Sequence, residues 1–139
     1  MQIDKNCHFE THPVQYHAPP WRYFAKRKGL DWTVHYFSDM GVKGGFDPGF
    51  GHVVTWDIPL LKGYKSVFLS RKSNLFDIKS LRIPDVRGLL TKGKFKCVRL
   101  LGYTNPFEWQ VIKTAKEPYV KKPAVGTNIS VAWTTMAYR

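Results

Sequence analysis

The sequence is poor in cysteine and has no long apolar run, and both shortages exclude classes of protein. Cys7 and Cys97 are the only cysteines, they lie far apart, and no CxxC pair occurs, so neither a disulfide framework nor a zinc site is expected. No apolar stretch approaches the roughly 20 residues that span a bilayer. The N-terminal segment carries charged and polar side chains where a signal peptide has its apolar core. We therefore expect reduced thiols and a cytoplasmic protein.

Several nucleotide-binding and nucleic-acid-binding motifs are also missing. The chain has no GxGxxG fingerprint, and none of its glycine-rich segments ends in the GK[ST] of a P-loop. RRM, KH, zinc-finger and helix-turn-helix patterns do not occur, so nucleic acid is not an expected partner. Internal repeats and low-complexity tracts are lacking too. What remains is one globular domain, residues 1–139, whose 43% hydrophobic residues suffice for a core.

Acidic residues are scarce relative to basic ones. The chain has 22 Lys and Arg against 10 Asp and Glu, a formal net charge of +12, which attracts phosphates on a nucleotide, an anionic lipid or a nucleic acid. The basic residues stand in short groups at the ends of predicted elements, which is typical of a solvated surface. The alternative is that Lys26, Arg27 and Lys28, beside Trp21, dock onto an anionic membrane.

Strand-like and helix-like segments alternate along the chain. Runs of β-branched and aromatic residues predict strands at 6–11, 32–37, 64–69, 95–101 and 123–127, the last leading into an apolar segment at 129–133. Proline near the start and glycine after the end predict helices at 19–28 and 83–92, and a third helix follows Asn105 and ends at Pro118. The alternation predicts an α/β fold, namely a Rossmann-like doubly wound, mostly parallel sheet with flanking helices.

Two of the predicted strands are less apolar than a sheet covered on both faces requires. Asn6, His8 and Glu10 interrupt the first strand, and Arg99 interrupts the fourth. These positions depart from the pattern expected for the predicted fold.

Ligands of doubly wound sheets collect at the carboxyl ends of the strands, where three predicted loops fall: 11–18, 39–51 and 102–105. The first loop offers His12, Gln15, Tyr16 and His17 ahead of a helix N-terminus, where free backbone N–H groups favour an anion. This loop suits a diphosphate or a polar acceptor. The alternative is that its histidines only hydrogen-bond the loop in place.

The second loop belongs to a glycine-rich segment, 38–63, that is predicted to contain no long helix or strand. Glycine lets a backbone approach a ligand closely, and the rim residues of this loop are Gly44, Gly45, Phe46, Asp47 and Gly49. A turn-rich lid or connection is the alternative.

The third loop contributes Tyr103 and Asn105. Asn105, Pro106 and Glu108 have the spacing of a helix capping box. No pair of acidic residues has the local context of a general acid and base, so no catalytic residue is assigned, and no metal ligands are predicted.

The run THPVQYHAPPWRYFAKRKGLDWTVHYFSDMGVKGGFDPGFG at 11–51 is followed by WDIPLLKGY at 56–64. It resembles the N-terminal region of bacterial family 4 glycosyltransferases, which are GT-B enzymes related to glycosyl transferase group 1. The resemblance is specific over 11–63 and looser over 64–127. It implies an enzyme of two Rossmann-like domains with the active site between them, in which this chain is the N-terminal, acceptor-side domain.

The resemblance further implies that a nucleotide-sugar donor binds to a C-terminal domain outside residues 1–139. We therefore expect this chain to bind no cofactor and to be inactive alone. The implied partners are a donor-binding glycosyltransferase subunit and a glycan or lipid-linked acceptor, in the cytoplasm and at the periphery of the inner membrane.

Within the resemblance, the loop of His12 to His17 would face the donor phosphates and the acceptor, with GGFDPGFG along the same rim. The segment 102–105 reads GYTN, without the functional histidine that family members often carry there. The alternative function is a standalone basic module that binds anions or an anionic membrane.

Overall fold

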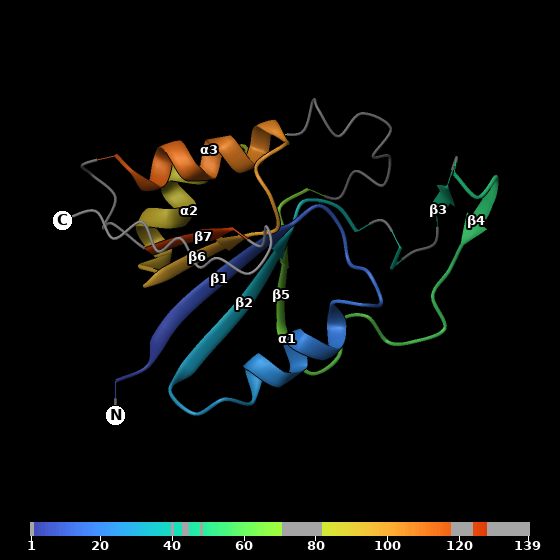
Figure 1. Cartoon of the computed structure of the whole chain (residues 1–139), viewed down its shortest axis with the longest axis horizontal. Helices are drawn as coiled ribbons and strands as arrows, with labels where there is room; N and C mark the ends of the chain where they lie inside the picture. Colours follow the sequence, from blue (N-terminus) through green and yellow to red (C-terminus); the bar gives the residue numbers. More distant parts are fainter. Residues whose placement is uncertain are drawn as a thin grey trace.

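A computed structural model describes residues 2–39, 41–42, 45–47, 49–70, 82–117 and 124–127. Its main feature is a five-stranded sheet in the order β5-β2-β1-β6-β7, in which all neighbouring strands are parallel (Figure 1). The strands are β1 (Asp4–Glu10), β2 (Leu30–Tyr36), β5 (Lys65–Phe68), β6 (Cys97–Leu100) and β7 (Ala124–Thr127). The predicted α/β fold with a parallel sheet is confirmed.

Helices cover both faces of this sheet. α1 (Ala18–Ala25) lies on one face, whereas α2 (Val86–Gly93) and α3 (Pro106–Ala115) lie together on the other (Figure 1). In the part of the chain that the structure describes, no helix is sufficiently long and apolar to cross a bilayer.

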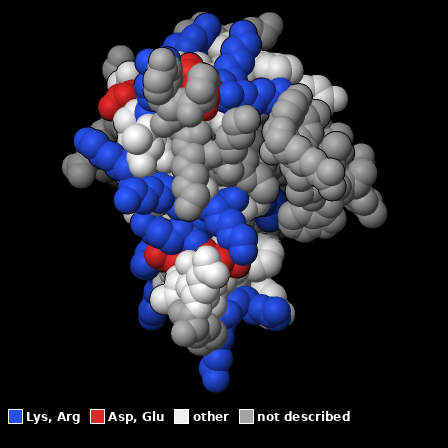
Figure 2. All heavy atoms as spheres, turned by 90° about the vertical axis from the view of Figure 1, so that its left-hand side faces the viewer, with Lys and Arg blue, Asp and Glu red and all other residues white. Residues whose placement is uncertain are grey.

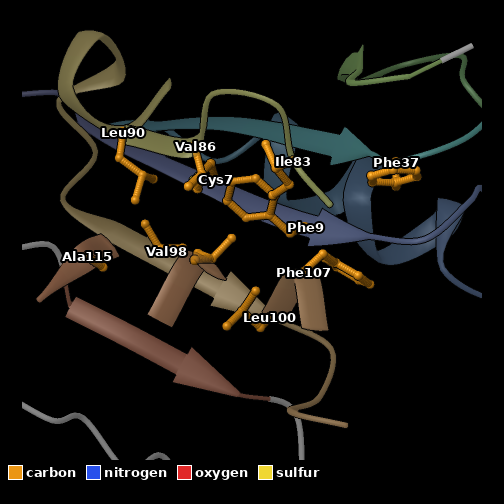
Figure 3. Packing of buried hydrophobic residues seen from close by; sticks show 11 residues of the cluster. Cys7, Phe9, Phe37, Ile83, Val86, Leu90, Val98, Leu100, Phe107 and Ala115 are labelled. Carbon is orange, nitrogen blue, oxygen red and sulfur yellow. The ribbon is translucent and has the colours of Figure 1, made fainter. Parts of the chain in front are cut away.

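The larger core lies between the sheet and the pair α2 and α3 (Figure 3). Phe9 of β1 and Leu100 of β6 are buried there together with Phe107 and Val111 of α3. Full burial of a side chain of this size contributes roughly 1.5–3 kcal/mol, so this layer fixes β1, β6 and α3 relative to one another. Ala115, the last residue of α3, is buried in the same core.

A smaller, aromatic core lies under α1 on the other face. The Trp21 ring of α1 packs on Trp32 of β2, with centroids 5.5 Å apart, and Val34 and Tyr36 complete the cluster. Trp21 is only 2% exposed. Trp21 is therefore part of this core and does not lie on the surface beside the basic segment 26–28, as the membrane-docking alternative assumed.

Two helix boundaries differ from the sequence prediction. α1 ends at Ala25 rather than at residue 28, and the chain turns into β2 through Gly29, whose φ is 77°. α2 begins at Val86 rather than at residue 83, because Asp85 caps it by accepting a hydrogen bond from the Gly88 N–H at 2.9 Å.

The end of α2 also differs from the sequence prediction, in which a glycine follows the helix. The left-handed residue is Lys94, with φ 48°, and not the glycine before it. Gly93 is the last residue of the helix, and a Cβ there would lie 2.1 Å from the Phe95 ring. Glycine at position 93 therefore provides space for an aromatic ring rather than an unusual φ.

The glycine-rich segment contains one small element, a hairpin. β3 (Gly45–Asp47) and β4 (His52–Val54) pair antiparallel and stand away from the main sheet (Figure 1). The absence of long elements in the described part of this segment agrees with the prediction. The hairpin itself was not predicted, because strands of three residues are too short to show an alternating pattern. Segment 129–133 and Pro118 lie outside the described residues.

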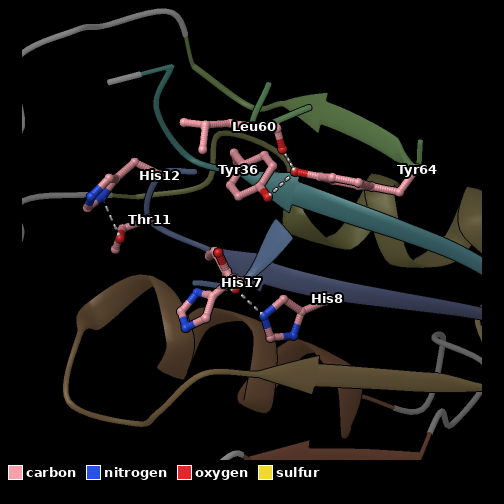
Figure 4. A network of polar contacts seen from close by, with 8 residues as sticks. His8, Thr11, His12, His17, Tyr36, Leu60 and Tyr64 are labelled. Carbon is pink, nitrogen blue, oxygen red and sulfur yellow. Dashed lines mark hydrogen bonds and ion pairs between the residues drawn. The ribbon is translucent and has the colours of Figure 1, made fainter. Parts of the chain in front are cut away.

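The chain after the hairpin is held against α1 and β2 by polar contacts. The Arg22 guanidinium donates to two carbonyls of segment 59–62, one of them that of Lys62 at 2.7 Å. The Tyr64 hydroxyl donates to the Leu60 carbonyl at 2.5 Å and pairs with the Tyr36 hydroxyl at 2.8 Å (Figure 4). The glycine-rich segment is thus anchored at its C-terminal end.

Candidate functional site

The candidate site is a buried carboxylate between two imidazoles at the carboxyl end of β1 (Figure 4). Glu10 is 2% exposed, and its Oε1 lies 2.9 Å from Nε2 of His8 and 3.1 Å from Nδ1 of His17. The first contact is a hydrogen bond, whereas the His17 nitrogen lies at ion-pair distance but off the direction of a good hydrogen bond. His8 is fully buried and His17 is 31% exposed, so His17 connects the carboxylate to the surface.

The alternating direction of the side chains along β1 explains why these groups meet. Successive side chains of a strand point to opposite faces, so Cys7 and Phe9 enter the core of α2 and α3 while His8 and Glu10 point towards α1. His17 is the N-cap residue of α1, which places its ring over the same face. The site therefore depends on α1 packing against this side of the sheet.

Another basic group shares this face. Arg99 of β6 is in register with His8, so the two residues are neighbours in the sheet. The Arg99 guanidinium lies over the Trp21 ring, 5.6 Å from its centroid, and the His8 ring lies 4.4 Å from the same ring. The polar residues at 8, 10 and 99, which interrupt the predicted strands, thus gather on one face.

The electrostatics of the site keep its proton on His17. Burial lowers the pKa of His8 by more than Glu10 raises it, so His8 is a neutral imidazole at neutral pH. Burial raises the pKa of Glu10, but the contacts with His17 and His8 outweigh this effect and leave that pKa below its ordinary value. The contact with Glu10 raises the pKa of His17. Both shifts act in the direction of an ionised Glu10 beside a protonated His17.

The N-terminus of α1 offers less to an anion than the sequence prediction assumed. Prolines at positions 19 and 20 have no N–H, and the Trp21 N–H donates to the His17 carbonyl at 3.2 Å. In the first turn of α1, this leaves Ala18 as the source of a backbone donor. The basic side chains near this position are His17 and Arg99, whose charges influence each other.

Of the predicted residues of the first loop, the structure brings His17 to Glu10. Nδ1 of the half-buried His12 lies 3.0 Å from the Thr11 hydroxyl, a contact within the loop of the kind that the alternative describes (Figure 4). Gln15 is half-buried, and Tyr16 is 76% exposed on the outside of the loop.

The glycine-rich segment meets the first loop near its start rather than at its rim residues. A Cβ on Gly41, whose φ is 88°, would lie 3.2 Å from the Pro13 carbonyl oxygen and 3.3 Å from Nε1 of Trp56. The predicted rim is elsewhere: Gly45, Phe46 and Asp47 form β3, Gly49 lies in the turn of the hairpin, and Gly44 is outside the described residues. Phe46 is 54% exposed, and the hairpin lies away from the end of β1 (Figure 1).

The turn after β6 has a structural role at Asn105. Its N–H donates to the Glu108 carboxylate at 2.9 Å, which confirms the predicted capping box of α3. Tyr103 in the same turn is 48% exposed. The third predicted loop therefore offers one phenol to a ligand and uses its amide residue to start a helix.

Within the described residues, no three His, Cys, Asp or Glu side chains are arranged to hold a metal ion. At the candidate site both imidazoles approach the same oxygen of Glu10. They do not converge on an empty position that a metal ion could occupy. No family model, no curated protein and no solved structure matches the chain.

Sequence reasoning missed Glu10, His8 and Arg99 as site residues. The available signal was their polarity in strands that a covered sheet should make apolar, because a buried charge is retained where it has a partner or a function. Chemically, the group holds one ionised carboxylate and presents a protonated imidazole and a guanidinium, which together suit an anionic ligand with a polar substituent.

Proposed function

We propose that this chain is the acceptor-side, Rossmann-like domain of a GT-B glycosyltransferase whose donor is a nucleotide sugar. The observation that carries the proposal is the charged group of Glu10 and His17 at the carboxyl end of β1. The sheet order supports a doubly wound interpretation, because the chain leaves β5 at one edge and returns as β6 on the other side of β1. In such sheets the ligand crevice lies where the connections change direction, which here is between β1 and β6.

The chemistry of glycosyl transfer gives each of these residues a role. The reaction forms a bond between the anomeric carbon and an acceptor oxygen and breaks the bond from that carbon to the diphosphate, which takes up the acceptor proton. The departing diphosphate gains negative charge, and hydrogen bonds from a protonated His17 and from Arg99 stabilise that charge. Glu10 keeps His17 protonated, and the neutral His8 holds Glu10 in position.

We assign the nucleotide of the donor to a partner domain or subunit, and the reaction to the cytoplasm. The resemblance of segment 11–63 to family 4 glycosyltransferases supports this division of the enzyme. The acceptor, a glycan or a lipid-linked saccharide, then binds on the side of the interdomain cleft that this chain forms.

The test is a transfer assay on the tagged chain purified from its native host together with the proteins that bind it. Radiolabelled UDP-glucose, UDP-N-acetylglucosamine and GDP-mannose serve as donors, and host membranes and polysaccharide serve as acceptors. We expect Glu10→Gln to lower incorporation about 100-fold and Lys62→Gln, a change of an exposed residue, to leave it unchanged. Equal incorporation by wild type and Glu10→Gln would exclude the assigned role of the site.

A second candidate function is a standalone anion-binding module, which the basic side chains around Glu10 favour. It predicts no incorporation from any donor but binding of inorganic pyrophosphate that His17→Gln abolishes. The transfer assay therefore separates the two functions, since only the first gives transfer, and isothermal titration calorimetry with pyrophosphate tests whether the site binds an anion at all.

A further inference from the structure

Basic residues line the amino ends of four adjacent parallel strands, at the edge opposite the candidate site. The Asp4 N–H donates to the Gly29 carbonyl at 2.8 Å, and the Lys96 N–H donates to the Lys5 carbonyl at 2.7 Å, so the starts of β2, β1 and β6 lie side by side. Lys65 begins β5, the next strand along. Neighbouring strands are about 4.8 Å apart, so their lysines form one continuous row.

We call this surface the basic edge. It comprises the exposed residues that begin the strands or lead into them: Lys5, Lys26, Arg27, Lys28, Lys65, Lys92, Lys94 and Lys96. In the space-filling view from this side, Lys and Arg cover far more of the described surface than Asp and Glu do (Figure 2). Asp4 and Asp31 are the acidic residues within the row, and they pair with Lys96 and Lys65 at 2.8 Å each. The basic edge therefore keeps a strong excess of positive charge.

Exposed apolar side chains lie among these charges. Ile3, just before β1, is 63% exposed and Tyr23 of α1 is 59% exposed. The Arg27 guanidinium lies 5.7 Å from the centroid of the Tyr23 ring and donates to its hydroxyl at 3.0 Å. A surface of lysines with interspersed apolar groups gains both from attraction to anionic lipid and from shallow burial in a bilayer interface.

The composition of the basic edge favours lipid over nucleic acid. All but one of its basic residues are lysines, whose compact charge lacks the planar donor fork with which arginine recognises an individual phosphate. The one arginine, Arg27, is engaged with Tyr23. A diffuse layer of phosphates is the partner that such a row fits.

We propose that the basic edge docks the protein onto an anionic lipid bilayer. The seven residues of β1 rise about 3.3 Å each, so the candidate site stands roughly 20 Å from the lipid surface and faces away from it. Docking rests on the basic edge alone and does not depend on the proposed function.

The experiment is sedimentation of the full chain with phosphatidylcholine vesicles, with and without phosphatidylglycerol, at physiological salt. The pair Lys5→Gln and Lys28→Gln should lower the partition coefficient on the anionic vesicles about 30-fold, at about 1 kcal/mol for each lysine. The control pair Lys62→Gln and Arg82→Gln removes the same charge elsewhere on the surface and should change it less than about threefold.

Three results would overturn the proposal. Equal losses in the two pairs would mean that net charge, and not the basic edge, determines binding. Equal binding to vesicles with and without phosphatidylglycerol would remove the electrostatic basis. Tighter binding to duplex RNA than to the anionic vesicles, lost in the same basic-edge pair, would make nucleic acid the partner. Thermal unfolding followed by circular dichroism verifies that all variants are folded.

Discussion

Replacing His35 with phenylalanine removes a titrating group from the interior of the sheet. His35 is 3% exposed, and its ring stacks on Phe9 at 5.1 Å and meets Phe95 edge-on at 5.8 Å between centroids. Burial lowers the pKa of His35 to about 4, and electrostatic repulsion from His8, once His8 takes up a proton in acid, adds to this effect. Nδ1 of His35 has no hydrogen-bond partner among the described residues, so a proton there would be a buried, unpaired charge.

The sign and size of the effect follow from this pKa. The folded-state pKa of His35 lies below the unfolded value of about 6.5, so the unfolded chain takes up the proton first as the pH falls. The free energy of unfolding therefore decreases from about pH 6.5 downward, and the decrease is complete near the folded-state pKa. At about 1.36 kcal/mol per pKa unit, the total loss is about 3 kcal/mol, of which about 2 kcal/mol is present at about pH 5.

Urea unfolding of wild type and His35→Phe at about pH 7.5 and about pH 5 measures this loss. Between the two pH values, the free energy of unfolding of wild type should fall by about 2 kcal/mol more than that of His35→Phe. Any packing cost of the larger ring is the same at both pH values and cancels in the comparison. Equal falls in the two proteins would refute the conclusion that His35 stays neutral because it is buried.

Three further changes test the site and the fold. Glu10→Gln should lower the pKa of His17, because the contact with the carboxylate raises it; an NMR titration of the His17 ring measures this, and an unchanged pKa would contradict the geometry of the site. Lys94→Gly should raise the free energy of unfolding by about 1 kcal/mol, since glycine relieves the left-handed conformation at the end of α2. Urea unfolding measures this gain, and a loss of stability would argue against that conformation. Tyr64→Phe removes the hydroxyl contacts that hold segment 59–62, so it should lower the free energy of unfolding by about 1 kcal/mol and speed proteolysis of that segment. Cleavage at the wild-type rate would show that these contacts are dispensable.

Much of the fold was predictable because the signals are local. The β-branched and aromatic residues of β2 mark a strand without reference to the rest of the chain. Asn105 and Glu108 mark the start of α3 because a capping box involves only residues three apart. The start of α2 was misplaced by three residues, since both Pro84 and Asp85 fit a helix start and only the contact with Gly88 decides between them.

The candidate site was only partly predictable because it depends on contacts between distant elements. The sequence places His17 at a helix N-terminus, but not the side of the sheet that the helix covers. The neighbours His8 and Arg99 are brought together by the register of β1 and β6, which no local pattern specifies. The polar interruptions of those strands were visible, and a parity argument would have placed His8 and Glu10 on one face.

The proposed function is tested most directly by glycosyl transfer from a nucleotide sugar, measured on the chain co-purified from its host and compared between wild type and Glu10→Gln. The proposal predicts incorporation by wild type and a loss of about 100-fold in a Glu10→Gln protein that is still folded by circular dichroism. Equal rates of transfer, or no transfer by wild type with any of the donors and acceptors, would contradict it.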